Sequence, residues 1–218
     1  MGSHTILFDL DGTLLNSHDG IINGMQFVLA KLKQPVPQAA DLSWCIGPPL
    51  EDNFRFLLGG DKVPDTKVRQ ATELYHEYYA ETGIFQANLY SGIAELIETL
   101  HQHNHQLYVA TSKLEQHAYA VLTHFGLQSF FHNIHGASRD GRVRKKVDVI
   151  HQAVVQNQLD AQQCIMIGDH EVDILGGKQH GMFTIGVTYG YGSNEEIIHA
   201  QPDKICTNSV ELKTLLLS

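Results

Sequence analysis

The chain has 218 residues, of which 43% are hydrophobic and 18% are charged, and its formal net charge is −9. This length suffices for one α/β domain with an insertion or for two small domains. No apolar stretch approaches the roughly 20 residues that span a bilayer, so we expect no membrane association. The acidic balance argues against a nucleic-acid polymer as a partner, because such binding needs a basic surface.

The start of the chain and its cysteines favour a cytoplasmic location. An apolar strand pattern begins at Thr5, which leaves no room for the charged and apolar regions of a secretion signal. The three cysteines, Cys45, Cys164 and Cys206, are odd in number and far apart, which favours reduced, buried thiols over disulfides. We therefore expect a protein of the reducing cytosol.

Short apolar runs alternate with helical patterns over much of the chain. Runs typical of buried parallel strands occupy residues 5–9, 106–110, 133–136, 164–168, 183–187 and 204–206. The apolar spacing i, i+3, i+4, i+7 predicts helices over 93–100 and 114–125, and Gly126 is placed to end the second one in a left-handed turn. The alternation predicts an α/β fold with a Rossmann-like parallel sheet flanked by helices and joined by right-handed crossovers.

Residues 15–87 interrupt this alternation. Two amphipathic faces predict helices here, one formed by Ile22, Met25, Leu29 and Leu32 and the other by Val68, Ala71, Tyr75 and Tyr78. No strand pattern accompanies them. We therefore expect an inserted helical domain at 15–87, within a core domain formed by residues 1–14 and 88–218.

Polar side chains follow the predicted strands at the points where the strands end. These residues are Asp9, Asp11, Thr111, Ser112, Lys113, Asp169 and Asp173. Because ligands bind where parallel strands present their carboxyl ends, we expect these side chains to converge. Clustered buried carboxylates normally hold a cation, and an all-oxygen ligand set fits Mg²⁺. A lysine, a hydroxyl group and backbone donors at Gly12 and Gly168 add the features of a phosphoryl-binding site.

Four short motifs at these positions resemble, in the same order, those of the haloacid dehalogenase-like phosphohydrolases. They are DLDGT at 9–13, TS at 111–112, a lysine ahead of a helix, and GDHEVD at 168–173. The inserted domain is similar to the small helical cap domain of the subgroup that includes phosphoglycolate phosphatase and β-phosphoglucomutase. The resemblance implies a Mg²⁺-dependent phosphomonoester hydrolase that acts on a small phosphorylated metabolite through an aspartyl-phosphate intermediate.

The resemblance also implies roles for the residues of the first two motifs. Asp9 would be the nucleophile and a Mg²⁺ ligand, and Asp11 would be the general acid and base, with its backbone carbonyl on the metal. Their two-residue spacing lets both carboxylates face the phosphate from different sides as the strand pattern ends. Thr111 and Ser112, with Gly12, would hold phosphate oxygens, and the two hydroxyl residues would also cap the next helix.

The third and fourth motifs would complete the site. The lysine region reads GRVRKKVDVI, without the proline that often follows the family's lysine. Lys146 is favoured because it leads directly into the apolar face of the next helix, and Lys145 is the alternative. Asp169 would bind Mg²⁺, and Asp173 would ligate or support it. The departure at the lysine, together with GVTYGYGS at 186–193, resembles a 5′-nucleotidase-like branch of the family.

Within the inserted domain, CIGPPLEDNF at 45–54 is similar to the substrate-specificity loop of the subgroup's caps. We expect Gly47, Pro48, Leu50 and Arg55 near the substrate, where a closing cap would exclude water and select the leaving group.

Two other functions fit the same motifs. A phosphomutase of the β-phosphoglucomutase type shares all four of them, and a phospho-ligand-binding protein without turnover could retain the site. The intact Asp11 favours an enzyme, since binding alone needs no proton shuttle. Phosphoglycolate, 5′-nucleotides and sugar phosphates all suit the core, and the sequence leaves the substrate and the oligomeric state open.

Overall fold

The computed structural model describes residues 4–218, which form two compact units. One unit consists of residues 4–16 and 88–218, and the other consists of residues 17–87. The predicted core domain begins at residue 1, and its residues 1–3 lie outside the described part of the chain.

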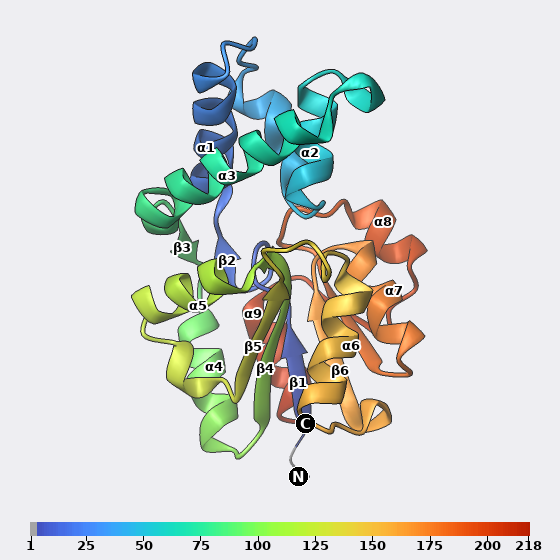
Figure 1. Ribbon diagram of the computed structural model, residues 1–218. Coiled ribbons are helices and arrows are strands. Elements are labelled where there is room, and N and C mark those ends of the chain that lie inside the picture. Colours follow the sequence, from blue (N-terminus) through green and yellow to red (C-terminus); the bar gives the residue numbers. More distant parts are fainter. Residues whose placement is uncertain (1–3) are drawn as a thin grey trace. The chain divides into compact units, whose positions relative to one another are not determined.

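The larger unit contains a six-stranded sheet in which every strand pair is parallel. The strand order is β5-β4-β1-β6-β7-β8 (Figure 1). The strands are β1 (Thr5–Phe8), β4 (Gln106–Leu114), β5 (Asn133–Ala137), β6 (Cys164–Gly168), β7 (Phe183–Val187) and β8 (Lys204–Cys206). All six follow the predicted apolar runs, and the predicted fold class is confirmed.

Strand β1 lies at the centre of the sheet and sets the position of the ligand edge. Leu7 aligns with Tyr108 of β4 on one side and with Met166 of β6 on the other. From β1 the chain adds β4 and then β5 on one side of β1. It then crosses to the other side and adds β6, β7 and β8, so the direction in which strands are added reverses beside β1. In an open parallel sheet, ligands bind outside the carboxyl ends of the strands at such a reversal. Asp9 follows β1 at this point.

Helices connect and cover the strands of the larger unit. They are α4 (Ile93–Gln102), α5 (Glu115–His124), α6 (Lys146–Gln156), α7 (Glu171–Gln179), α8 (Asn194–His199) and α9 (Ser209–Leu216), with 3₁₀ segments η4 (Gln128–Phe130) and η5 (Ala161–Gln163). Helix α6 packs against α7, and α4 packs against α9. Gly126 has φ of 70°, which confirms the left-handed turn predicted after α5.

Two local expectations are wrong. Residues 15–87 are not free of strand, because β2 (Leu15–Asn16) pairs antiparallel with β3 (Asn88–Leu89). A ladder of two residues is too short to show an alternating pattern in the sequence. Furthermore, β4 continues to Leu114, so Thr111 and Ser112 lie within the strand and do not cap α5. The Thr111 hydroxyl instead accepts a hydrogen bond from the Lys113 N–H at 3.2 Å.

The inserted unit is helical. It contains α1 (His18–Lys31), α2 (Leu50–Leu57) and α3 (Asp65–Glu81), with 3₁₀ segments η1 (Ala39–Cys45), η2 (Gly60–Lys62) and η3 (Gly83–Phe85). Helix α1 packs against α3. Tyr79 is fully buried and stacks on Tyr75 with 5.5 Å between the ring centroids, whereas Tyr78 is half-buried. Tyr78 stacks on Phe27 at 4.7 Å.

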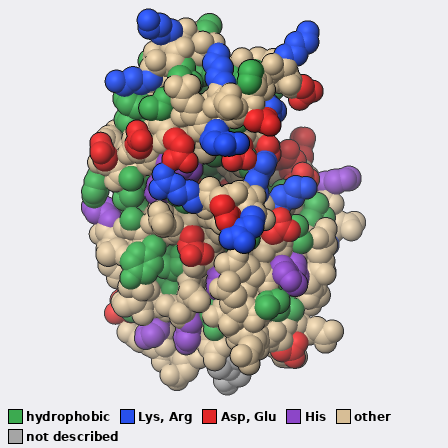
Figure 2. Space-filling view, in the orientation of Figure 1, with side chains coloured by type: hydrophobic (Ala, Val, Ile, Leu, Met, Phe, Trp, Pro, Cys, Tyr) green, Lys and Arg blue, Asp and Glu red, His purple; other side chains and the backbone are tan. Residues whose placement is uncertain are grey.

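Among the described residues, no helix combines the length and apolar character that crossing a bilayer requires. The three cysteines are buried free thiols. On the face drawn in Figure 2, Lys and Arg side chains are interspersed with Asp and Glu. The cytoplasmic location and the exclusion of a nucleic-acid polymer stay predictions.

Leu7→Ala should destabilise the larger unit strongly, because Leu7 is fully buried in the central strand. We expect the free energy of unfolding to fall by about 2–5 kcal/mol in chemical denaturation. Val210→Ala in α9 is the control, since Val210 is 70% exposed and should change stability little. Equal effects of the two substitutions would contradict the central position of β1.

Candidate active site

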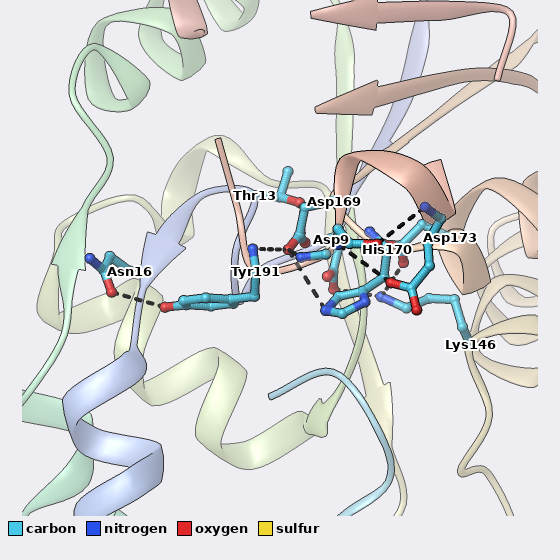
Figure 3. Close-up of polar contacts among 11 residues, drawn as sticks. Asp9, Thr13, Asn16, Lys146, Asp169, His170, Asp173 and Tyr191 are labelled. Atoms are coloured by element: carbon cyan, nitrogen blue, oxygen red, sulfur yellow. Dashed lines mark hydrogen bonds and ion pairs between the residues drawn. The ribbon is translucent and has the colours of Figure 1, made fainter. Parts of the chain in front are cut away.

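Asp9 lies directly after β1 and belongs to a buried ionic cluster. Its Oδ1 accepts a hydrogen bond from the Lys146 Nζ at 2.5 Å. The same ammonium group donates to the Ala110 carbonyl at 2.9 Å and lies 2.8 Å from Asp173 Oδ1. Figure 3 shows Asp9, Asp173 and Lys146 pointing toward one another. Of the two candidate lysines, Lys146 is therefore the one in the cluster, and Lys145 is exposed.

Asp169 follows β6 and is completely buried beside Asp9 (Figure 3). Its Oδ1 accepts a hydrogen bond from the Thr13 hydroxyl at 3.1 Å. Its Oδ2 accepts hydrogen bonds from the backbone N–H groups of Tyr191, at 2.8 Å, and Gly192, at 3.4 Å. The loops after β1 and β7 thus fix the orientation of this carboxylate.

Asp173 lies in the first turn of α7, where both of its oxygens are engaged within the protein. Oδ1 faces Lys146, and Oδ2 accepts a hydrogen bond from the His170 backbone N–H at 3.0 Å. Asp173 therefore caps its own helix while it orients the ammonium group of Lys146. The arrangement favours a supporting position for Asp173 over direct ligation of a metal.

The loop after β7 connects the parts of the site through two tyrosine hydroxyls. Tyr189 donates a hydrogen bond to the Thr13 carbonyl at 3.0 Å, and Tyr191 donates one to Asn16 Oδ1 at 2.9 Å (Figure 3). The sequence GVTYGYGS does not by itself indicate this role. The contacts to Asp169 come from backbone N–H groups, which leave no signal in residue type.

Two glycines allow these loops to approach closely. Gly12 has φ of 90°, and a Cβ atom there would collide with the Asp169 carboxylate. A Cβ atom at Gly190 would collide with Asp169 and with the Gly12 carbonyl. The Gly12 N–H donates to the Leu15 carbonyl at 2.8 Å. The predicted use of that N–H for phosphate stays a prediction, and Gly12 provides space for the carboxylate.

Asp11, Thr111 and Ser112 occupy the same edge of the sheet. Asp11 follows β1, and its Oδ2 lies 2.9 Å from the Nζ of Lys113 on β4. Thr111 is buried and Ser112 half-buried at the end of β4. Lys113 was predicted at this edge from its position after the apolar run, without a specific role.

Burial and mutual repulsion perturb the carboxylates of the cluster. Burial raises the pKa of Asp9, and the nearby charge of Lys146 opposes this shift. Burial, followed by the charges of Asp9 and Asp173, raises the pKa of Asp169 to about 7. Burial alone would lower the pKa of Lys146, but the charges of Asp173 and Asp9 outweigh it and raise that pKa. The cluster therefore holds more negative charge than its lysine neutralises.

The carboxylates meet the requirements of a cation site. Asp9, Asp169 and Asp173 each present an oxygen within 4.8 Å of the others. With Asp11 this edge carries four carboxylates, and Lys113 and Lys146 are the two lysines that pair with them. When all are ionised, the edge has two negative charges in excess, which one divalent ion would balance. A cation would also favour the ionised forms that burial opposes at Asp9 and Asp169. Oxygen ligands select a hard ion.

The predicted substrate residues of the inserted unit lie around the start of α2. Gly47 has φ of 107°, Pro48 is exposed, and Leu50 begins the helix. Arg55 is held within this unit, since it donates to Asp65 Oδ1 at 2.6 Å and to the Val63 carbonyl at 3.2 Å. These contacts already occupy the guanidinium group.

Comparisons with known proteins agree with this geometry. Residues 6–187 match the family model described as haloacid dehalogenase-like hydrolase. The chain belongs to this family.

The relatives cover nearly all of the chain. A 5′-nucleotidase of Pseudomonas aeruginosa is 38% identical over 213 residues, which are 98% of this chain and 95% of that protein. A crystal structure of a predicted phosphatase from Clostridium acetobutylicum has a TM-score of 0.92 and 34% identity, with 99% of each chain covered. Tyrosine-protein kinase PtkA of Mycobacterium tuberculosis is 35% identical over 187 residues, or 86% of this chain and 62% of that protein. The haloacid dehalogenase-like relatives support a phosphoric monoester hydrolase.

Gly190→Ala should displace Asp169, because the added methyl group meets its carboxylate and the Gly12 backbone. We expect a loss of about 1–3 kcal/mol in unfolding free energy and a weaker apparent affinity for the activating cation, measured by cation titration of activity. Gly126→Ala is the control, since its φ of 70° strains a Cβ atom that would meet no neighbour within 4 Å. This control should lose stability but retain its cation response.

The raised pKa of Asp169 predicts a pH-dependent stability. Between pH about 4 and about 7 the native state keeps a proton that the unfolded chain has lost, so unfolding free energy should decrease as pH rises. Denaturation in a chelator should show this slope, and Asp169→Asn should reduce it. Asp61→Asn, an exposed control, should leave it unchanged. An unaltered slope in Asp169→Asn would contradict the assignment.

Proposed function

We propose that the protein is a Mg²⁺-dependent phosphomonoester hydrolase that transfers the phosphoryl group of a small phosphorylated metabolite to Asp9. One observation carries the proposal. Asp9 lies at the carboxyl end of the central strand, 2.5 Å from the buried Lys146 and close to the buried carboxylates of Asp169 and Asp173, which could hold a cation with it. A nucleophile, a fixed positive charge and a divalent-ion site in one place suit phosphoryl transfer.

Asp9 and Asp169, with the backbone carbonyl of Asp11, would hold the ion. Asp173 supports the site through Lys146, since both of its oxygens already have partners. When bound, Mg²⁺ supplies positive charge that offsets the charge on the transferring phosphoryl oxygens. Lys146 would add a second positive charge, and the Thr111 hydroxyl would bind a phosphoryl oxygen together with Ser112.

Asp9 and Asp11 divide the chemistry between them. Asp9 attacks phosphorus, the bond from phosphorus to the leaving oxygen breaks, and Asp11 donates a proton to that oxygen. Water then attacks the phosphoryl group on Asp9 and loses a proton to Asp11. The bond between phosphorus and Asp9 breaks, and phosphate leaves.

For the substrate, we propose a nucleoside 5′-monophosphate. The support is the 38% identity along 98% of the chain to a protein named 5′-nucleotidase, together with the lysine motif that lacks a proline. Phosphoglycolate is the alternative substrate. In this proposal the inserted unit acts as the cap, and Gly47, Pro48 and Leu50 contact the leaving group.

Asp9→Asn should abolish hydrolysis, because an amide oxygen cannot form the acyl phosphate. Release of inorganic phosphate from nucleoside 5′-monophosphates, phosphoglycolate and sugar phosphates, with Mg²⁺ or with a chelator, measures this. We expect the chelator to remove activity and added Mg²⁺ to restore it. Asp61→Asn is a matched control and should remain active.

Full activity of Asp9→Asn would refute the nucleophile. Isomerisation of a sugar phosphate without release of phosphate would instead identify a mutase. Turnover of phosphoglycolate but of no nucleotide would overturn the proposed substrate while leaving the mechanism intact.

A further inference from the structure

A second lysine, Lys113, is buried at the active-site edge. It forms an ion pair with Asp11, the residue proposed as general acid. The side chain of Lys113 is 6% exposed and that of Asp11 is 13% exposed, and the Nζ of Lys113 lies 2.9 Å from Asp11 Oδ2. Lys146 contacts Asp9 and Asp173, and it also donates to the Ala110 carbonyl of β4. The proposed mechanism gives Lys113 no function, although burial of an ammonium group is unfavourable unless it is paired.

An irregularity in the sheet places Lys113 at this edge. Ala110 of β4 aligns with His135 of β5, but Leu114 aligns with Ala137, so four steps along β4 match two along β5. The extra residues lie between Ala110 and Leu114, and Lys113 is one of them. Irregularities of this kind change the direction of side chains and occur beside active sites. In a regular strand, residues 111–113 of β4 would each have continued the one-to-one pairing with β5.

We propose that Lys113 is a positioning residue for Asp11, holding its carboxylate in the orientation needed for proton transfer. The proposal rests on the proposed function. An aspartate beyond the end of a strand has two rotatable side-chain bonds, and its proton reaches the leaving oxygen only in a narrow range of orientations. The ion pair engages Oδ2 and restricts rotation of the Asp11 side chain. Lys113 acts through Asp11 in this proposal and need not touch the substrate.

Hydrolysis of two aryl phosphate esters of similar size distinguishes positioning of Asp11 from a purely structural role of Lys113. Phenyl phosphate needs proton donation to its leaving oxygen, whereas 4-nitrophenyl phosphate needs much less because its leaving group is stable as an anion. The kcat/KM value reports the first transfer, to Asp9, for both esters. We expect Lys113→Met to lower kcat/KM for phenyl phosphate by about tenfold or more and for 4-nitrophenyl phosphate by less than about threefold.

Three further variants test the link to Asp11. Lys113→Arg should restore most of the phenyl phosphate activity, since it keeps the charge. Asp11→Asn should show the same preference for 4-nitrophenyl phosphate, and adding Lys113→Met to it should cause no further loss. Lys213→Met is the matched control, because Lys213 forms an ion pair of the same 2.9 Å length with Glu95 away from this edge. It should leave both esters unaffected.

Equal losses on the two esters, or independent losses in the double variant, would overturn the proposal. If Lys113→Met does not fold, Lys113→Gln is used in its place in the comparison of the two esters, with the same expected result. Crystal structures give a readout that does not depend on turnover: Asp11 should occupy one rotamer in the natural protein and several in the Lys113 variant. An unchanged single rotamer would overturn the positioning role. Failure of the natural protein to hydrolyse either ester with Mg²⁺ would instead overturn the proposed function.

Discussion

The repulsion among buried carboxylates at one edge of the sheet is the constraint on which the site depends. Asp9, Asp169 and Asp173 present oxygens within 4.8 Å of one another, and burial makes their charges costly. Lys146 relieves part of this repulsion by bridging Asp9 and Asp173. In the proposed function, the remaining excess of negative charge would give the site its affinity for a divalent ion, and through that ion for phosphoryl groups.

Backbone pairing and hydrogen bonds hold each acid of this unfavourable cluster in place. Phe8, directly before Asp9, pairs with Val109 and Ile167 on the two neighbouring strands, and the Asp9 N–H donates to the Ile167 carbonyl at 2.8 Å, so the backbone holds Asp9 in place. Asp169 is held by one hydroxyl and two backbone N–H groups. Asp173 is held by its own helix terminus. Each acid is thus constrained independently, which keeps the cluster together before any ligand arrives.

The sheet and the acids could be predicted from the sequence because their physical causes are local. Apolar runs mark buried strands, and Asp9, Asp11 and Asp169 follow such runs directly, where parallel strands must present their ends. Lys146 could be preferred over Lys145 because an apolar helical face begins beside it. The parts that were missed arise from contacts between distant segments. The Tyr191 N–H bond to Asp169, the short ladder of Leu15 with Leu89, and the shift in pairing beyond Ala110 leave no pattern in residue type.

The use of main-chain donors on Asp169 has a consequence for how the protein tolerates variation. A substitution at position 191, other than to proline, would remove the hydroxyl that bonds Asn16 but would keep the N–H group that holds the carboxylate. Lengthening or shortening the segment between β7 and α8 by one residue is different, since it moves the donors themselves. Loop length is therefore a second requirement for the position of this carboxylate, beside the glycine at 190 that leaves room for it.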